Sequence, residues 1–234
     1  MDHDNGNKSL HDRVVRVIGA RIVRGNLKEG DKIDSDGTLA REFGASRTAM
    51  REAVRVLTDK GLVESRPRLG TRVRSSEHWN YLDVDILSWH QWSDDRQWVQ
   101  DLLEMRRLIE PKAAAIAASR GSVETFARMR GALDTMASCA VSGSLEEAVF
   151  ADIAFHKEIL AATRNNMISS LHYAISASLR VTLTETKRDL LQSSLPAHYK
   201  VLSAIESRNP DAAYRAMEDL IQHAADDLLG QSSQ

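Results

Sequence analysis

Residues 36–63 read DGTLAREFGASRTAMREAVRVLTDKGLV, and this stretch decides the fold of the N-terminal part of the chain. A short helix should end at Phe43-Gly44, after which Ser46 offers a side-chain oxygen as the N-cap of a second helix. Gly61 suits the end of that helix because glycine tolerates left-handed dihedrals. Apolar residues follow the i, i+3, i+4, i+7 pattern of one helix face at Met50, Ala53, Val54 and Leu57. The stretch therefore predicts two helices joined by a tight turn.

Arginines occupy another face of the second helix, where Arg47, Arg51 and Arg55 lie four residues apart. Residues 62–66 and 71–74 can then form two strands around a turn. This hairpin would carry four further arginines beside the helix: Arg66, Arg68, Arg72 and Arg74. The helix with the arginine row suits insertion into the major groove of DNA, and the hairpin would then lie at phosphates or at the minor groove. A solvated basic face on an ordinary helical hairpin is the alternative. The agreement of cap, turn, helix and wing favours a winged helix-turn-helix.

The length and composition limit the class of protein. The 234 residues suit two modest domains or one large one. No apolar run approaches the roughly 20 residues that a membrane helix needs, and the polar residues 1–8 lack the apolar core of a secretory signal. Cys139 is the only cysteine, so an intrachain disulfide cannot form, which fits a reducing compartment. We therefore expect a cytoplasmic protein that does not associate with a membrane.

The net charge of −2 conceals an asymmetry along the chain. Residues 1–76 contain 16 lysines and arginines and 11 acidic residues, a balance of +5. The remaining residues contain 15 and 22, a balance of −7. A basic module joined to an acidic body indicates that the first meets nucleic acid and the second meets something else.

The rest of the chain reads as helical. A first helix is expected over about 9–24 and a linker at 75–78. The aromatic segment 79–89 should pack where the two domains meet, with ligand stacking as the alternative. Caps and breaks then predict six helices at 96–119 (kinked at Pro111), 122–140, 144–164, 166–191, 196–208 and 210–229. The predicted fold is mainly α: a winged helix-turn-helix over 1–76 joined to an all-α bundle of six to seven helices over 77–234.

The chain resembles the GntR family of bacterial regulators, in the branch whose C-terminal domain is an all-α effector-binding fold (the FCD type). The N-terminal residues that match are Leu39-Ala40, Phe43-Gly44, Ser46-Arg47, Arg51-Glu52-Ala53, Leu57, Gly61-Leu62-Val63 and Gly70-Thr71. The C-terminal matches are Glu104-x-Arg106, Glu110-Pro111, Asp152-x-x-x-His156 and His198. Residues 79–89 look like those of the sugar-acid-responsive members.

This resemblance implies contacts to a double-stranded DNA operator from Arg47, Thr48 and Arg51, assisted by the wing from Arg68 to Gly70. The sequence departs from the family at residues 34–37, where Asp-Ser-Asp-Gly replaces a Pro-Ser-Glu-Arg-like start. The family arginine at the last of these positions often contacts DNA, and the resemblance implies no such contact at Gly37.

A polar site is predicted inside the bundle. Asp152 and His156 share a helix face, and His156 and His198 each lie in an apolar stripe of their own helix. A metal ion would offset the cost of burying the carboxylate, but an Asp–His hydrogen bond would also do so. The resemblance implies a divalent metal held by one Asp and three His. Zn²⁺ is the first candidate and Ni²⁺ or Mn²⁺ are alternatives.

The third histidine is ambiguous, because the family position falls on Leu220. His223, one turn later, is slightly favoured over His172, and a three-ligand site with open positions is the other reading. A small carboxylate effector could also bind an arginine. Arg106 is the first candidate, since the family's Glu-x-Arg falls there, and Arg180 is the second, with a surface or ion-pair role as its alternative.

We therefore expect a homodimeric repressor of a sugar-acid operon, released by an aldonate such as galactonate, with one recognition helix per operator half-site. The rival is a metal-dependent enzyme in which Asp152, His156 and His198 hold a metal that activates water. No general base, nucleophile elbow or phosphate loop accompanies those residues, which disfavours an enzyme.

Overall fold

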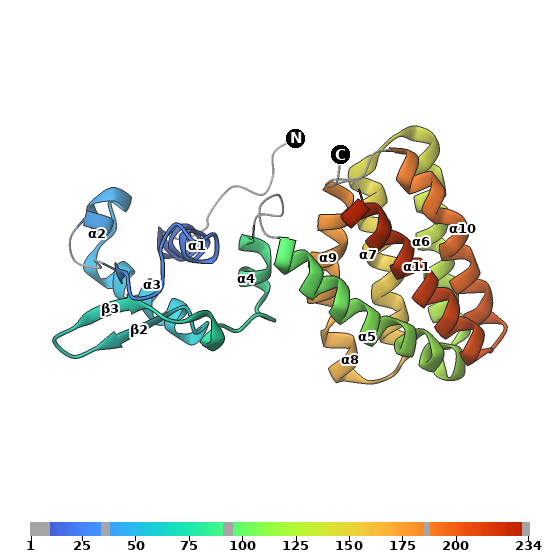
Figure 1. Ribbon diagram of the computed structural model, residues 1–234, viewed down its shortest axis with the longest axis horizontal. Helices are drawn as coiled ribbons and strands as arrows, with labels where there is room; N and C mark the ends of the chain where they lie inside the picture. The colour runs from blue at the N-terminus through green and yellow to red at the C-terminus, as the bar shows by residue number, and fades with distance from the viewer. Residues whose placement is uncertain (1–9, 34–37, 91–95, 185–187, 231–234) are drawn as a thin grey trace. The chain divides into compact units, whose positions relative to one another are not determined.

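The computed structural model describes residues 10–33, 38–90, 96–184 and 188–230. The chain divides into two compact units, Met1–Gln91 and Trp92–Gln234 (Figure 1). The boundary thus falls later than the one predicted after residue 76, because the segment that follows the wing packs on the N-terminal helices. Residues 34–37, where the sequence departs from the GntR pattern, lie outside the described residues.

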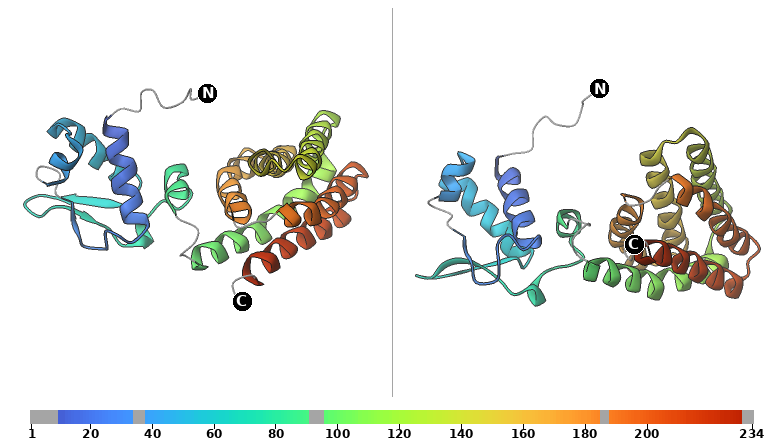
Figure 2. Two further views of the ribbon diagram at one scale, coloured as in Figure 1. Left: turned by 90° about the horizontal axis from the view of Figure 1, so that it is seen from above. Right: turned by 45° about the horizontal axis from the view of Figure 1, so that its top comes forward.

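The N-terminal unit contains the predicted helix-turn-helix and its wing. The hairpin of β2 (Val63–Arg66) and β3 (Gly70–Val73) extends beyond the helices of this unit (Figures 1 and 2). The sheet of this unit has three antiparallel strands in the order β1-β3-β2, and β1 (Lys32–Ile33) was not predicted because two residues show no alternation. The elements are α1 (Leu10–Val23), β1 (Lys32–Ile33), α2 (Thr38–Phe43), α3 (Arg47–Asp59), β2 (Val63–Arg66), β3 (Gly70–Val73), the 3₁₀ turn η1 (Ser76–His78) and α4 (Val84–Trp89).

Helix α3 begins and ends as the sequence predicts. The Ser46 hydroxyl accepts a hydrogen bond from the Ala49 backbone N–H at 3.2 Å, an N-cap of about 1 kcal/mol. Gly61 follows the helix with φ +81°. The predicted apolar face is buried: Met50, Ala53, Val54 and Leu57. That face packs in one core with α1 and leaves the arginine side of α3 in solvent.

The aromatic segment after the wing belongs to this same core. Ile86 and Trp89 of α4 are buried in it, and the Trp89 ring lies so close to α1 that a Cβ on Gly19 would be 2.1 Å from Cζ3. The Arg24 Nε donates to the Trp89 carbonyl at 3.0 Å. The segment was expected where the two domains meet, which stays a prediction; its buried Ile86 and Trp89 belong to the N-terminal core.

The described residues of the C-terminal unit form seven helices and no strand, which confirms the all-α prediction. Helix α11 lies beside α5, as Figure 2 shows, and α6 packs on α7. The helices are α5 (Arg96–Arg120), α6 (Val123–Ser142), α7 (Leu145–Ala162), α8 (Asn166–Ser170), α9 (His172–Thr184), α10 (Arg188–Glu206) and α11 (Pro210–Gly230).

Two predicted helix limits in this unit change. The segment predicted as one helix over 166–191 is divided at Leu171, which ends α8. Helix α10 begins at Arg188 rather than at Pro196, so the proline taken as a helix start lies inside the helix. Pro111 lies within α5, which remains one helix across it.

The predicted caps between helices are present except at Ser144, whose side chain forms no cap hydrogen bond with α7. Ser122 forms a capping box with Thr125, Gly143 ends α6 with φ +84°, and the Asn165 side chain accepts from the backbone of α8. Among the described residues, no helix is both long enough and apolar enough to cross a membrane.

Candidate nucleic-acid interface and metal centre

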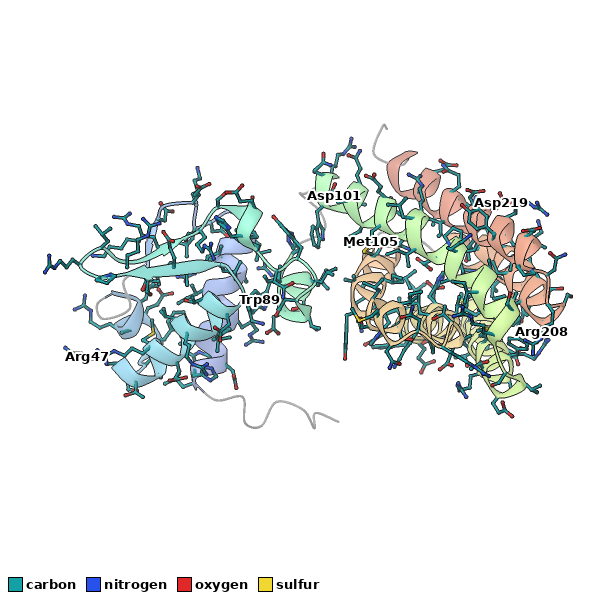
Figure 3. The ribbon with its side chains drawn as sticks, turned by 90° about the horizontal axis from the view of Figure 1, so that it is seen from below. Arg47, Trp89, Asp101, Met105, Arg208 and Asp219 are labelled. Atoms are coloured by element: carbon teal, nitrogen blue, oxygen red, sulfur yellow. The ribbon has the colours of Figure 1, made fainter. Side chains whose placement is uncertain are left out.

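The start of α3 presents cationic groups to solvent. Arg47, Thr48 and Arg51 are exposed, and Figure 3 shows Arg47 at the outer end of the helix. Within the described part of the chain, neither arginine forms a hydrogen bond or an ion pair, so both guanidinium groups keep their donors available. Arginine presents a planar donor pair to guanine or to phosphate. The arrangement expected from the sequence is therefore present in the fold.

Arg55, the third arginine of that row, differs from the other two. Its guanidinium lies 3.1 Å from Glu52 and 3.6 Å from Asp59, with both carboxylates on the same helix. A DNA contact would have to compete with these acidic groups. Of the three arginines in the row, Arg47 and Arg51 are therefore the two whose guanidinium groups have no partner among the described residues.

The wing also holds a single uncommitted arginine at its tip. Arg66 pairs with Glu64 at 3.1 Å, and Arg72 donates to the Gly30 carbonyl at 2.7 Å. Arg68 is exposed in the turn with φ +66°, and it has no hydrogen bond or ion pair to any residue that the structure describes. Gly70 follows with φ +77°, a conformation that favours glycine. The turn therefore presents Arg68 outward from the hairpin.

A cluster of ionisable side chains is buried in the C-terminal unit. Arg106 and Glu110 come from α5, Asp152 and His156 from α7, and His198 from α10, and each is less than a tenth exposed. Three of these helices thus contribute side chains to one interior site. Burying so many charges is costly unless they are paired, so their partners determine what the site can do.

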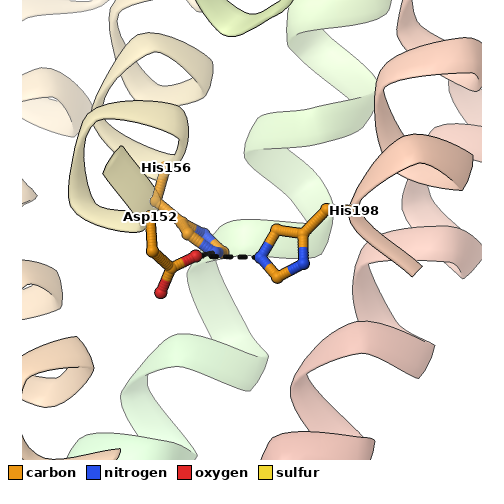
Figure 4. A group of neighbouring side chains, drawn as sticks. All are labelled: Asp152, His156 and His198. Atoms are coloured by element: carbon orange, nitrogen blue, oxygen red, sulfur yellow. Dashed lines mark hydrogen bonds and ion pairs between the residues drawn. The ribbon is translucent and has the colours of Figure 1, made fainter. Parts of the chain in front are cut away.

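The two imidazoles converge on one carboxylate, as Figure 4 shows. The His198 Nε2 lies 2.8 Å from the Asp152 Oδ1, and the His156 Nε2 lies 3.5 Å from the same oxygen. One ligand atom from each residue lies within 4.8 Å of the others. The Phe155 ring packs in T-shaped geometry against both imidazoles, with its centroid 5.6 Å from the His156 ring and 5.4 Å from the His198 ring.

The outer nitrogen of each imidazole is also engaged. The His198 Nδ1 lies 2.9 Å from the Ser194 carbonyl, and the His156 Nδ1 is hydrogen-bonded to the Glu110 Oε2. The other oxygen of Glu110 accepts from the Arg106 Nε at 2.5 Å. The Nη1 of Arg106 is buried and has no hydrogen-bond partner among the described residues. The cluster therefore contains one unsatisfied donor.

Mutual pairing sets the charges of this cluster. Burial alone would raise the pKa of Glu110, but the charges of Arg106 and His156 outweigh it and lower the pKa to about 2. For Asp152, burial is likewise opposed by hydrogen bonds from His156 and His198, which hold its pKa well below the usual range. Burial would lower the pKa of His156, but Glu110 and Asp152 raise it to about 9. Both carboxylates are therefore ionised at neutral pH.

The donor set fits a divalent metal ion. One carboxylate oxygen and two imidazole nitrogens are borderline ligands of the kind that Zn²⁺, Ni²⁺ and Mn²⁺ accept. With Nδ1 of each histidine turned to a hydrogen-bond acceptor, Nε2 is left toward the centre of the cluster, which is the usual arrangement around a metal. Asp152, His156 and His198 are the residues that could hold the ion.

The histidines considered as a third ligand lie elsewhere. His223 is exposed on α11, because Leu220 and Ile221 take the buried face of that helix. His172 is half-buried, with its Nδ1 2.8 Å from the Ser169 carbonyl. Neither belongs to the group formed by the described residues, so the favoured assignment of His223 is corrected. The alternative drawn from the sequence, a site with three protein ligands and open positions, stays a prediction.

The two effector candidates also separate. Arg106 is in the buried cluster, as expected. Arg180 is exposed, with its guanidinium carbon 5.1 Å above the Phe150 ring, and it lies outside the cluster. Glu110 was not among the predicted site residues, although its position four residues after Arg106 on one helix was a usable signal.

Comparison with known families and proteins agrees with both halves of this description. The family described as "Bacterial regulatory proteins, gntR family" matches residues 10–73, and the family described as "FCD domain" matches residues 101–223. Among solved structures, Lar, which controls the expression of the Listeria monocytogenes agr system, gives a TM-score of 0.66 at 19% identity. It covers 94% of this chain and 99% of its own.

Curated relatives match over most of the chain. The galactonate operon transcriptional repressor of Escherichia coli K12 is 31% identical over 216 residues, covering 90% of this chain and 93% of that protein. The transcriptional regulator LutR of Bacillus subtilis 168 is 32% identical over 216 residues, covering 89% and 96%. The uncharacterized regulator YieP of Escherichia coli K12 is 31% identical over 216 residues, covering 92% and 94%.

Proposed function

Since the chain belongs to the GntR family of bacterial regulators and carries an FCD domain, we propose that it represses a sugar-acid operon and releases its operator when the acid binds. As a member of this family it is a DNA-binding transcriptional regulator and not an enzyme. The observation that carries the proposal is the buried acid–histidine cluster, with its unsatisfied arginine donor, in a chain whose α3 arginines remain uncommitted.

A divalent metal is the first part of the proposed ligand site. Asp152, His156 and His198 would hold it, with Zn²⁺ as the first candidate and Ni²⁺ or Mn²⁺ as alternatives. A bound divalent ion supplies a Lewis-acidic centre that attracts the oxygens of a small acid. Three protein ligands leave coordination positions for such oxygens.

The effector is proposed to be an aldonate, such as galactonate, because it combines a carboxylate with neighbouring hydroxyl groups. Arg106 would supply its remaining N–H groups to an acid or hydroxyl oxygen, since its Nε is already occupied by Glu110. An unsatisfied buried donor costs about 1–3 kcal/mol, and a ligand oxygen would remove that cost. The galactonate repressor among the relatives supports this class of ligand.

Repression requires that effector and operator prefer different conformations of the protein. A homodimer would place one α3 helix in each half of a palindromic operator, with Arg47, Thr48 and Arg51 at the bases. The sugar acid can release the DNA only if it binds better to a conformation in which these helices are misplaced. A coupling of about 1–3 kcal/mol would change the operator affinity about 5- to 150-fold.

The test uses the full chain and a DNA site enriched from a random pool by the protein itself. Operator affinity is measured by fluorescence anisotropy with Zn²⁺-replete protein, with and without galactonate, gluconate or the neutral sugar galactose. We expect at least one acid to weaken binding and galactose to have no effect. A panel in which no acid changes either the operator affinity or the melting temperature would contradict the proposal.

A further inference from the structure

Glu110 links Arg106 to His156 within the buried cluster. It comes from α5, is 2% exposed, and uses both carboxylate oxygens. The Oε1 accepts from the Arg106 Nε at 2.5 Å, and the Oε2 is hydrogen-bonded to the His156 Nδ1 on α7. A buried carboxylate with two charged partners is held in place by both, so its orientation is fixed.

This contact distinguishes His156 from His198. The Nδ1 of His198 meets a neutral backbone carbonyl, that of Ser194, four residues earlier on its own helix. The Nδ1 of His156 meets an ionised carboxylate from another helix. A carboxylate partner orients an imidazole and increases the basicity of its other nitrogen more than a carbonyl does. In His156 that other nitrogen, Nε2, faces Asp152.

We infer that Glu110 is a positioning residue for the proposed metal centre, which turns the Nε2 of His156 toward the ion and keeps the ring proton on Nδ1. The inference rests on the metal site of the proposed function. Glu110 would not bind the ion itself. It would act through His156, and the hydrogen bond from Arg106 would keep the Glu110 carboxylate in place. Helix α5 would therefore be tied to the metal centre through a hydrogen bond, although it contributes no ligand atom.

The test compares Glu110→Gln with Glu104→Gln, which removes the same charge from an exposed position of α5. Zn²⁺ affinity is measured by competition with a chelating dye on protein shown to be folded by circular dichroism. We expect Glu110→Gln to weaken Zn²⁺ binding roughly 10- to 100-fold and Glu104→Gln to leave it unchanged. A folded Glu110→Gln protein with wild-type affinity would overturn the inference and leave the metal centre standing.

A second variant protects the test against misfolding. Removing only the acid leaves Arg106 buried without its ionic partner, so the double variant Arg106→Gln, Glu110→Gln removes both charges together. The same loss of Zn²⁺ affinity is expected for the double variant.

Histidine-selective ¹⁵N spectra of the Zn²⁺-loaded protein supply a readout that a purely structural role would not move. The wild-type His156 should carry its proton on Nδ1 with a strongly deshielded resonance, which should shift upfield in Glu110→Gln. An unchanged resonance would contradict the positioning role. A wild-type protein that takes up no Zn²⁺ would overturn the metal centre and this inference together.

Discussion

Arg47 and Arg55 lie on the same row of α3 and carry the same charge, but only Arg55 is paired with neighbouring carboxylates. We predict that Arg47→Ala weakens specific operator binding by about 1–3 kcal/mol, because a base contact is lost. Arg55→Ala should weaken it less, since Glu52 and Asp59 already share that guanidinium. Fluorescence anisotropy on one operator at fixed salt measures both. Equal losses for the two variants would argue against a base-reading role for Arg47.

Arg68 is expected to act through phosphate rather than through a base. Removing one phosphate contact makes the negative slope of log affinity against log salt shallower by about 0.9. We therefore predict that Arg68→Ala flattens the salt dependence and weakens specific and non-specific DNA about equally. Arg66→Ala, at a paired position of the same wing, is the matched control. A slope that remains at the wild-type value would place Arg68 away from the phosphates.

Single residues of the proposed ligand site could be predicted only where the helical periodicity of the sequence revealed them. His156 and His198 stood out because each imidazole interrupts an apolar stripe of its own helix. Glu110 lies four residues after Arg106 on one helix, which was a usable signal, but its contact to His156 joins two helices and leaves no spacing in the sequence. His223 was misplaced because the edge of an apolar face is ambiguous from periodicity alone, and the structure exposes it.

At the scale of elements, the contact between α1 and α4 is the tightest test of the fold of the N-terminal unit. A methyl group on Gly19 would overlap the Trp89 ring, so Gly19→Ala should destabilise this unit by about 1–3 kcal/mol. Gly131→Ala, in α6 with open space around it, should instead stabilise its unit by up to about 1 kcal/mol. Urea unfolding followed by circular dichroism measures both changes. A neutral Gly19→Ala would mean that α4 is not held on α1.

Helices whose apolar pattern repeats over several turns were predictable from the sequence. Short elements, and contacts between elements, were not. Helix α3 follows from its N-cap and its apolar face, and the breaks at Gly143 and Asn165 follow from capping chemistry. The segment containing α4 has several aromatic residues, but composition does not say which surface they cover. The burial of Ile86 and Trp89, with the Trp89 ring against Gly19, assigns it to the N-terminal core.

At the scale of the whole molecule, the residues that the structure describes form two apolar cores that share no residue. One is built around α1 and α3, and the other around α5, α7 and α10. The charge asymmetry of the sequence indicated two parts. It did not give the boundary between the two units, because the acidic part of the sequence begins before the N-terminal unit ends. We therefore expect a ligand bound in the second core to raise the free energy of unfolding of the C-terminal unit and to leave that of the N-terminal unit unchanged.

Metal removal should follow that division. An ion present at 100 times its dissociation constant stabilises the state that binds it by about 2.7 kcal/mol. In calorimetry of the full chain, a chelator should lower one unfolding transition and leave the other in place, because Asp152, His156 and His198 all lie in the C-terminal core region. Operator affinity without effector should persist, while the response to the sugar acid is lost. Asp152→Asn is the control, since a chelator should not lower its transition further. If chelation shifts neither transition, no metal is bound at the proposed site. If chelation weakens operator binding in the absence of effector, the metal has a role outside the ligand site.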